Sequence, residues 1–510
     1  MSRVVSITAT DGEKVEYVDD GLAMSGGQKE VFWSPDRSYV VAFPNYLVEK
    51  DARECLHRLV DDYRIAIFEG EGGESFRELF CWPERIVEWK GMIGLVYPAF
   101  DRKFYFSGGP LKGAEKTAGW FASAKSFSRN VPAESRGTLR DHVWTCMELC
   151  RAVGRLHSAG LVLADLSDNH LLIDPPTGSV LVTGTDQIFS PGEFSSDVLG
   201  SRGYMAPETV KNMYIHARQS EKCQPSVETN LHSLAVLVYG LLLHRHPLLG
   251  LADWTLDDAL RESRKLGKGA LFIEHPKDPA NRLLPYTGWE DFLPWADTDQ
   301  VPFAVLGPHL GKLFIDAFVR GLHVSRLRPT ALAWEDALAR TLDLMVPCPG
   351  PDCPAGWVVV TGKARTPVCP LCGTPWGLPS LPYLDLRFFR DGGKSFPDGG
   401  RLVGYEGRPV RSWHADRDIP PERCGPPDWG TRTGGTVGSG PGSGTVAEFA
   451  FRDGKWFLVN RGLDSLEDLA TGTRVPVDTG IALSHGQELI LSRAEGGRTA
   501  VAGMVYKLEE

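Results

Sequence analysis

Cysteine, long apolar runs and excess positive charge are all scarce in this sequence. Ten cysteines in 510 residues are too few for a disulfide framework. No stretch reaches the roughly 18 consecutive apolar residues that a membrane-spanning helix needs, and residues 1–11 lack the apolar core of a secretion signal. The net charge of -10 argues against general binding to nucleic acids or acidic membranes. These absences predict a cytoplasmic protein with neither nucleic acid nor membrane as a partner.

The chain is long enough for several hydrophobic cores. Its composition, 42% hydrophobic and 24% charged, is that of a globular protein, and 510 residues exceed what one core supports. We therefore expect a multidomain α+β chain. The predicted parts are a small mixed lobe over residues 1–110, a helical lobe over 111–345, a metal-binding segment over 346–378 and a β-rich domain over 379–510.

Periodic patterns support the first two parts. Tyr39–Phe43 predicts a strand and Asp51–Tyr63 a helix, as in a small α+β lobe. Apolar residues between Leu139 and Val153 recur at spacings of three and four, which predicts one face of a helix. Leu231–Leu243 is apolar nearly all round, so it predicts a helix buried at a domain centre.

The last part of the chain has a different pattern. Residues 430–444 hold seven glycines and almost nothing apolar, which predicts a flexible linker. Thr445–Phe451 and Lys455–Val459 then alternate across a glycine turn, as the two strands of a β-hairpin do. We expect His414 and His485 in this part to be surface histidines rather than ligands.

Four of the cysteines form two close pairs, Cys348 with Cys353 and Cys369 with Cys372, separated by fifteen residues. Two short loops that each supply two thiolates satisfy a tetrahedral Zn²⁺. Four sulfur ligands leave no open position for water, so the predicted zinc site is structural. It would help to fold a segment with little apolar content of its own.

The residues from Arg155 to Asp186 resemble the catalytic loop and metal-binding triplet of protein kinases. Asp165 stands where the family has the carboxylate that orients the attacking hydroxyl. The family's magnesium-binding Asn comes five residues later, where this chain has His170, and Asn169 stands one place early. In the triplet, either Asp186 or Gly184 aligns with the magnesium-binding Asp, and the sequence leaves this open.

The first lobe carries a weaker form of the resemblance. Gly26, Gly27 and Lys29 resemble a shortened glycine-rich loop that would bind ATP. Pro44 ends the following strand where the family has its phosphate-clamping Lys. The resemblance then implies that Lys29 reaches the phosphates instead and that Glu54 on the predicted helix pairs with Lys29.

A third group of residues extends the resemblance toward the end of the helical lobe. The run Leu199–Glu208 resembles the end of an activation segment, and Glu208 is expected to form a buried ion pair with Arg328. Asn230 begins the central helix at the position of an Asp that supports the catalytic loop in the family. This activation segment favours a protein kinase, or an inactive relative, over a small-molecule kinase.

Less common segments, such as Phe80–Glu88 and Phe272–Asn281, are similar to bacterial kinases associated with tellurite resistance. The resemblance covers about residues 20–375. It implies a stress-response system and, as partners, a PP2C-type phosphatase and a von Willebrand A-domain protein. The tail from Leu381 resembles a forkhead-associated β-sandwich, although no phosphothreonine-binding Ser and His stand at the usual spacing.

Two main functions follow from these resemblances. The first is a serine/threonine protein kinase that uses ATP and Mg²⁺, with Asp165, Asp186, Lys29 and either Asn169 or His170 in its site. The second is a pseudokinase scaffold or nucleotide sensor that binds partners without transferring phosphate, which the departures at Pro44, His170, Gly184 and Asn230 favour. A third is a zinc-stabilised adaptor in which the β-rich domain does the main work.

Overall fold

The computed structural model describes most of the chain as two compact units. Unit 1 comprises residues 1–137, 145–298 and 312–335, and unit 2 comprises residues 138–144, 299–311 and 336–510. The predicted four-part division stays a prediction. The described residues are 3–19, 24–26, 29–46, 48–70, 72–213, 222–250, 263–283, 294–360, 368–375, 380–390, 394–419 and 444–505. No helix among them is long and apolar enough to cross a membrane.

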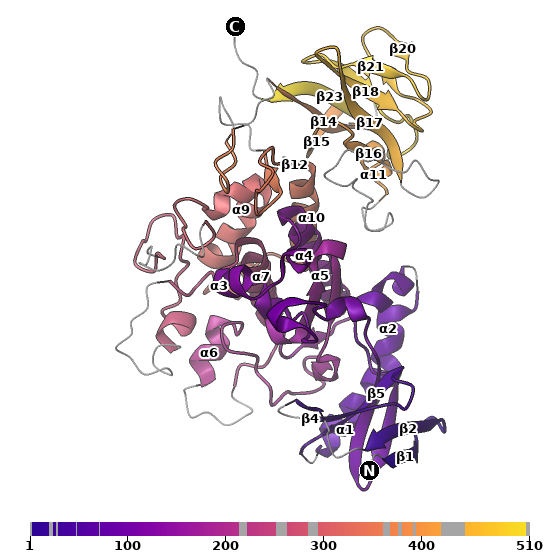
Figure 1. Ribbon diagram of the computed structural model, residues 1–510, viewed down its shortest axis with the longest axis vertical. Helices are drawn as coiled ribbons and strands as arrows, with labels where there is room; N and C mark the ends of the chain where they lie inside the picture. Colours follow the sequence, from indigo (N-terminus) through magenta and orange to yellow (C-terminus); the bar gives the residue numbers. More distant parts are fainter. Residues whose placement is uncertain are drawn as a thin grey trace. The chain divides into compact units, whose positions relative to one another are not determined.

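Unit 1 contains a five-stranded antiparallel sheet of order β3-β4-β5-β7-β6. Figure 1 labels its strands β4 and β5. The strands of the sheet are β3 (Met24–Gly26), β4 (Lys29–Trp33), β5 (Tyr39–Pro44), β6 (Arg85–Trp89) and β7 (Met92–Pro98). The predicted strand over 39–43 is confirmed. A hairpin of β1 (Arg3–Thr8) and β2 (Lys14–Asp19) precedes the sheet. Ile7 and Tyr17 of this hairpin are buried in one cluster with Val41 and Phe43 of the sheet.

The helix predicted over Asp51–Tyr63 is present and is longer than predicted. It runs as α1 (Lys50–Arg58), a π-helical turn (Leu59–Tyr63) and α2 (Arg64–Phe68). Leu59 and Ile67 are fully buried on its inner side, and Trp82 donates a hydrogen bond to the Leu59 carbonyl at 3.0 Å. These contacts fix the helix next to the sheet.

The remainder of unit 1 is mainly helical. It contains α3 (Ala124–Arg129), α4 (Ala133–Arg136), most of α5 (Leu139–Ser158), α6 (Pro207–Met213) and α7 (Val227–Leu243), with parts of α9 (Gly307–Ile315) and α10 (Ala331–Asp343). Every residue from Thr229 to Leu243 is buried, which confirms the predicted central helix. Ser226 and Thr229 form a capping box at the start of α7 and thereby set its first turn.

Two short antiparallel strand pairings position the loop that follows α5. β8 (Val162–Leu163) pairs with β11 (Ile188–Phe189), and β9 (Leu171–Asp174) pairs with β10 (Ser179–Val182). All of these residues are buried except Ser179, which is half-buried. Because both pairings are antiparallel and apolar, they hold the residues between β8 and β9 against those between β10 and β11.

Unit 2 contains a separate all-β region, as predicted, built from two antiparallel sheets. One sheet has the order β15-β14-β23-β22-β19-β20, and the other has the order β16-β17-β18-β21. The strands are β14 (Leu381–Arg390), β15 (Lys394–Val403), β16 (Pro409–Arg411), β17 (Thr445–Arg452), β18 (Lys455–Asn460), β19 (Glu467–Asp468), β20 (Thr473–Arg474), β21 (Gly480–Ala482), β22 (Glu488–Ile490) and β23 (Arg498–Val505). The predicted hairpin is β17 with β18. The predicted linker lies outside the described residues except for Gly444.

The prediction that His414 is a surface residue is wrong, whereas His485 is exposed as predicted. His414 lies on the short helix α11 (Ser412–Ala415) and is 1% exposed. Its Nδ1 accepts a hydrogen bond from the Arg411 backbone N–H at 2.9 Å, so its Nε2 donates to Asp343 at 3.0 Å. No local pattern indicates this contact, because the two residues are 71 positions apart.

Arg408 joins the β-rich region to the end of α10 within unit 2. It is 1% exposed and donates to the carbonyl oxygens of Met345 at 2.9 Å and Leu342 at 3.1 Å. The final carbonyls of a helix have no partner inside the helix, and a cation is favoured there. Arg408 therefore supplies both the hydrogen bonds and the charge that this helix end needs.

We predict that Arg408→Ala destabilises unit 2 by about 3 kcal/mol, because it leaves the buried carbonyl groups of Leu342 and Met345 without this donor. Differential scanning calorimetry of the full chain should show a lower midpoint for the unfolding step. Arg452→Ala is the matched control, since Arg452 is exposed in the neighbouring strand β17, and its effect should stay within about 0.5 kcal/mol. Equal midpoints for both variants would contradict this role of Arg408.

Candidate functional site

Asp165 lies in the loop between β8 and β9 and is 7% exposed. Its Oδ1 accepts a hydrogen bond from the Ser201 backbone N–H at 2.8 Å, and its Oδ2 accepts one from the Ser201 hydroxyl at 2.7 Å. The His170 Nδ1 lies 3.4 Å from Oδ2 and 3.0 Å from the Asp165 carbonyl oxygen. Both carboxylate oxygens therefore already have partners within the protein.

Asp165 and His170 shift each other's pKa. Burial acts to raise the pKa of Asp165, but the hydrogen bonds from His170 and Ser201 outweigh it, so the pKa lies below its ordinary value. Burial acts to lower the pKa of His170, but the Asp165 carboxylate outweighs it, so this pKa is raised. The two groups thus stabilise each other as an ion pair.

His170 stands where the kinase resemblance expects the magnesium-binding Asn, and Gly184 is one of the two alternatives, with Asp186, for the magnesium-binding Asp. The pairing of β9 with β10 brings them together, because the Thr183 N–H donates to the His170 carbonyl at 2.9 Å. Gly184 has φ of +67°, and a Cβ atom at this residue would lie 2.7 Å from the imidazole ring of His170. The ring therefore fills the space that a side chain at position 184 needs. Mg²⁺ takes oxygen ligands, and neither residue offers a side-chain oxygen.

Lys29 and Asp186 form an ion pair at 2.5 Å, with exposed side-chain fractions of 26% and 13%. Lys29 begins β4 and lies directly opposite Pro44 of β5 in the sheet register. Pro44 stands where the resemblance expects the phosphate-clamping Lys. Lys29 of the neighbouring strand thus places a cation at the same level of the sheet. The Tyr97 hydroxyl donates to Asp186 at 3.4 Å, and burial holds the pKa of Tyr97 well above its ordinary value.

The other predicted residues of the nucleotide site are placed less favourably. Glu54 is exposed on α1, and no ion pair within the described residues joins it to Lys29, so the predicted pair is not formed. Lys29 pairs with Asp186 instead. Gly26 pairs with Lys29 in the β3–β4 hairpin, whereas Gly27 lies outside the described residues. Asn169 is exposed, so His170 is the residue of this pair that contacts Asp165.

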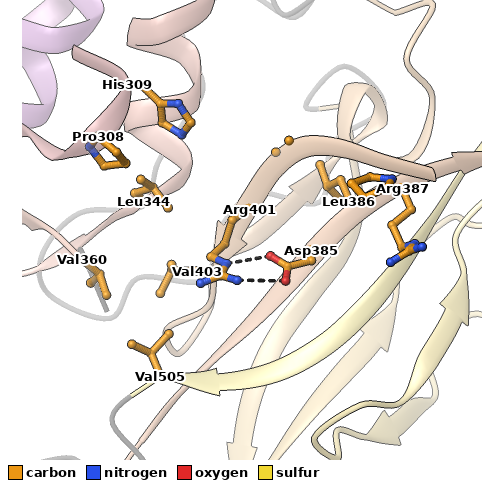
Figure 2. Close-up of a pocket in the computed structure, with 13 residues that line it drawn as sticks. Pro308, His309, Leu344, Val360, Asp385, Leu386, Arg387, Arg401, Val403 and Val505 are labelled. Carbon is orange, nitrogen blue, oxygen red and sulfur yellow. Dashed lines mark hydrogen bonds and ion pairs between the residues drawn. The ribbon is translucent and has the colours of Figure 1, made fainter. Parts of the chain in front are cut away.

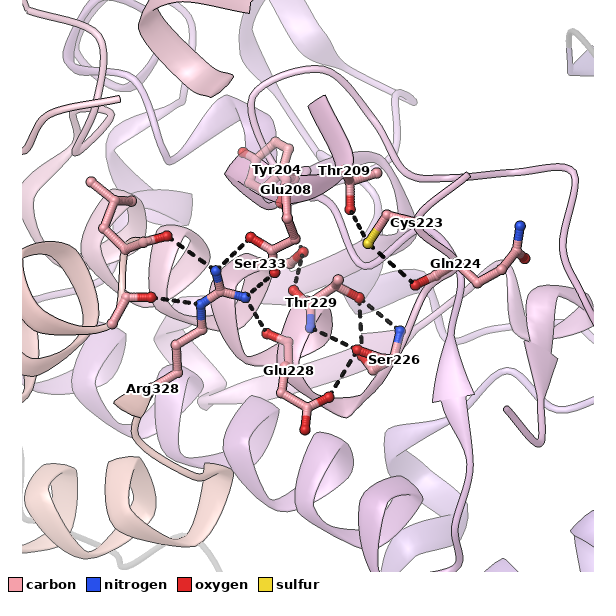
Figure 3. Close-up of polar contacts among 12 residues, drawn as sticks. Tyr204, Glu208, Thr209, Cys223, Gln224, Ser226, Glu228, Thr229, Ser233 and Arg328 are labelled. Atoms are coloured by element: carbon pink, nitrogen blue, oxygen red, sulfur yellow. Dashed lines mark hydrogen bonds and ion pairs between the residues drawn. The ribbon is translucent and has the colours of Figure 1, made fainter. Parts of the chain in front are cut away.

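The predicted ion pair between Glu208 and Arg328 is present (Figure 3). The two guanidinium nitrogens lie 2.7 Å and 2.8 Å from the two carboxylate oxygens. Arg328 is buried and also donates to the carbonyl oxygens of Glu228, Gly321 and Leu322. This bidentate pair fixes the start of α6, and with it the end of the segment that contains Ser201.

Asn230 holds the strand that precedes the Asp165 loop. Its side-chain amide donates to the Leu163 carbonyl at 2.8 Å and accepts from the Leu163 N–H at 3.1 Å. A carboxylate accepts hydrogen bonds but cannot donate them, so an amide satisfies both backbone groups where an Asp would satisfy one. The departure at Asn230 therefore keeps the loop in place.

Ser201 and Tyr97 are two residues of the site that the sequence did not identify. Ser201 lies within the activation-segment run, but its distance of 36 positions from Asp165 gave no sign of a contact. Tyr97 is one apolar-patterned residue in the buried strand β7, and nothing in the local sequence marks its hydroxyl as a partner of Asp186.

A second cluster, in unit 2, consists of the four predicted cysteines. The sulfur atoms of Cys348, Cys353, Cys369 and Cys372 all lie within 4.8 Å of one another. Cys348 and Cys372 are 3.5 Å apart, and Cys353 and Cys369 are 3.8 Å apart. Four sulfurs around one tetrahedral ion at about 2.3 Å are separated by about 3.8 Å. A Cβ atom on Gly350 would lie 2.9 Å from the Cys372 sulfur, so glycine keeps this space open. The cluster therefore fits a metal ion.

We predict that the Asp165–His170 pair makes stability depend on pH. Its contribution is present above the ordinary Asp value of 3.8 and below the ordinary His value of 6.5. It is lost as the pH falls through the lowered pKa of Asp165 or rises through the raised pKa of His170. NMR titration of ¹³C-labelled histidine should show a His170 pKa above 6.5, and Asp165→Asn should lower it.

His170→Gln assigns the resonance in that titration, and Ser201→Ala is the matched control because it removes a partner of Asp165 while keeping the carboxylate. A His170 pKa that does not change when Asp165 becomes Asn would show that the two groups are not coupled.

Comparisons with known proteins agree with a kinase-like chain only in part. No protein-family model matches. A rice (Oryza sativa subsp. japonica) protein named calcium-dependent protein kinase 15 is 32% identical over 101 residues, which is 19% of this chain and 17% of that protein. The match therefore spans about one sixth of the relative's length.

Several solved structures are similar at low identity. A rhoptry kinase from Toxoplasma gondii is 14% identical with a TM-score of 0.40, covering 68% of this chain and 86% of that one. ROP2 from the same organism, described as having a protein-kinase fold and no enzymatic activity, is 13% identical with a TM-score of 0.38, covering 67% and 84%. Vaccinia related kinase 3 is 12% identical with a TM-score of 0.41, covering 66% and 90%. Similarities of this size say nothing about activity and add nothing to the geometry.

The internal contacts of unit 1 carry the conclusion on fold. A five-stranded antiparallel sheet with an adjacent helix precedes a helical part with a fully buried central helix. Asp165 lies in the loop between paired strands, Asn230 supports that loop, and Glu208 pairs with Arg328. These are the parts, in the order, that the sequence resemblance predicted. Unit 1 therefore has a protein kinase-like fold.

Proposed function

We propose that this chain is a pseudokinase, a kinase-like protein that acts by binding other proteins rather than by transferring phosphate. The observation that carries the proposal is the contact between His170 and Gly184. His170 stands where a phosphotransfer site needs an oxygen ligand for magnesium, and Gly184 stands at the second such position in one of the two alignments. Here the imidazole lies 2.7 Å from the Cβ position of that glycine.

The state of Asp165 supports the same proposal. A catalytic carboxylate orients the hydroxyl that attacks the phosphate, so it needs an oxygen atom available to the substrate. Here Ser201 bonds to both oxygens of Asp165, and His170 neutralises its charge. A substrate hydroxyl would have to displace these partners, which costs the hydrogen bonds that they make.

A second candidate function is a bacterial serine/threonine protein kinase that transfers the γ-phosphate of ATP to protein hydroxyls. The Lys29–Asp186 pair favours it, because a cation opposite Pro44 and a carboxylate after β10 are the two charges that a nucleotide site needs most. Its residues would be Asp165, Asp186 and Lys29.

The proposed partners are proteins. The resemblance to tellurite-resistance kinases points to a PP2C-type phosphatase and a von Willebrand A-domain protein in a cytoplasmic stress-response system. The two-sheet region of unit 2, which we propose to be forkhead-associated-like, is the part of the chain suited to hold such partners. The four-cysteine cluster is proposed as a zinc ribbon with a structural role, since its four thiols leave no coordination position for a substrate.

We predict that the purified chain takes up no phosphate when incubated with ATP and Mg²⁺ or Mn²⁺, either on itself or on a generic protein substrate. Intact-mass spectrometry measures this directly, with Asp165→Asn as the matched control and phosphatase treatment to remove phosphate acquired during expression. The absence of any added phosphate on both proteins supports the pseudokinase. Phosphate that appears only when Asp165 is present would establish the kinase, and Lys29→Met should then abolish the transfer.

We predict that the chain binds about one zinc ion and that Cys369→Ser with Cys372→Ser abolishes the binding. Because metal binding couples to the folding of the segment that supplies the ligands, the double variant should also unfold at a lower temperature. Elemental analysis and calorimetry of the full chain give both values. Cys146→Ser is the matched control, since its thiol is buried far from the cluster in sequence. Zinc retained by the double variant would overturn the ribbon.

A further inference from the structure

Unit 2 contains a cavity of about 390 Å³ next to strands β14 and β15 (Figure 2). This volume lies in the range of small-molecule sites. Most of its wall is apolar. The side chains come from α9, from Leu344 directly after α10, from Val360 and from strands β14, β15 and β23. The apolar residues that line it are Pro308, Leu344, Val360, Leu386, Pro397, Val403 and Val505.

A bulge in β15 shapes one side of the cavity. Asp385 pairs with Arg401 and Arg387 pairs with Pro397, so the single residue Leu386 faces three residues of β15. Two of these three are Gly399 and Gly400. Gly399 has φ of +76°, where side chains are disfavoured, and a Cβ atom on Gly400 would lie 3.4 Å from Leu386. Bulges occur preferentially where a strand must re-aim a side chain beside a site.

The side chain beside this bulge is Arg401, which is fixed on two sides. Its Nε and one terminal nitrogen donate to the two oxygens of Asp385 at 2.6 Å and 2.9 Å. Its guanidinium carbon lies 3.9 Å from the centre of the Tyr383 ring. The other terminal nitrogen, Nη1, has no hydrogen bond to any described residue, and Figure 2 shows it on the side away from Asp385, toward Val403. A donor held in this way loses little entropy when it binds a ligand.

The other polar groups around the cavity set the sign of its charge. His309 lies on α9 at the opposite side of the cavity. Burial and the nearby Arg340 lower its pKa, so this imidazole is neutral at pH 7. Arg387 lines the cavity and donates to Ser395. Asp385, the acidic residue among the described lining residues, is already paired with Arg401. The charge of the site is therefore positive, with one directed donor.

From this geometry we infer that the cavity binds a small organic acid with an apolar body, whose carboxylate contacts Arg401 Nη1 while its apolar part lies among Leu344, Val360, Leu386 and Val403. A cation is disfavoured because the described lining residues carry two arginines, Arg387 and Arg401, against one carboxylate, Asp385. A purely apolar ligand would leave the Nη1 donor without a partner, which costs binding energy. This site lies in unit 2 and does not depend on the proposed function of unit 1.

The test is isothermal titration calorimetry of the full chain with octanoate, octanol and octylammonium as probes that share one apolar tail. We expect saturable binding of octanoate, at least tenfold weaker binding of octanol and no binding of octylammonium. Arg401→Gln should weaken octanoate binding at least tenfold and leave octanol unchanged. The matched control is Arg474→Gln, because Arg474 lies in β20 of the same sheet with a 77% exposed side chain outside the cavity.

A second variant tests the apolar part of the cavity separately from the charge of Arg401. Val403→Trp should fill the apolar part and abolish binding of both octanoate and octanol, and the thermal midpoint shows whether that variant is folded. Arg401→Gln changes a side chain that is 40% exposed, so its folding is not at risk. Octanol that binds as tightly as octanoate would overturn the acid recognition. Absence of saturable octanoate binding at millimolar concentrations, or binding equally weakened by Arg474→Gln, would overturn the site.

Discussion

The antiparallel pairing of β9 with β10 is the constraint on which the candidate site depends. Leu171 pairs with Val182, and both residues are buried. Because the two strands meet in this register, the residues just outside them, His170 and Gly184, must lie against each other. Asp165 contacts His170 from the preceding loop, and Asp186 follows from the other strand to meet Lys29. This apolar pairing thus brings His170, Gly184 and Asp186 together, while Asn230 holds the strand before Asp165 and the Glu208–Arg328 pair holds the segment with Ser201.

Each departure from the kinase pattern is compensated by a contact elsewhere in the structure. The imidazole of His170 needs a residue without a side chain at position 184, and glycine provides it. Pro44 removes a Lys, and Lys29 supplies a cation from the strand position directly opposite. Asn230 replaces a carboxylate and satisfies both backbone groups of Leu163. Such matching keeps the fold intact while the side chains of the site differ from the kinase pattern, and the fold alone does not establish an activity.

The sequence predicted well those features that depend on local patterns or on close spacing. The buried helix α7, the hairpin β17–β18 and the cysteine cluster follow from periodicity and short-range spacing. It failed for contacts between distant positions, because nothing local identifies their partners. Tyr97 bonds to Asp186 across 89 positions, and the buried His414 bonds to Asp343 across 71. Likewise, alignment alone left Asp186 and Gly184 as alternatives, and the bulge beside Arg401 had no sequence signal.

The charged side chains of the site in unit 1 are already paired with each other, and this pairing bears on its activity. An enzyme that binds a polyanionic nucleotide keeps cations and metal-binding oxygens available for that ligand. These unpaired groups lower the stability of the unliganded protein. Here Lys29 is neutralised by Asp186, and Asp165 by His170, so each charged group has a partner before any ligand arrives. Both pairs are largely buried, so water screens them weakly and breaking them is costly. Nucleotide binding would have to separate Lys29 from Asp186, and His170 offers magnesium no oxygen ligand. The electrostatics of the site thus stabilise the unliganded protein, which favours the proposed pseudokinase.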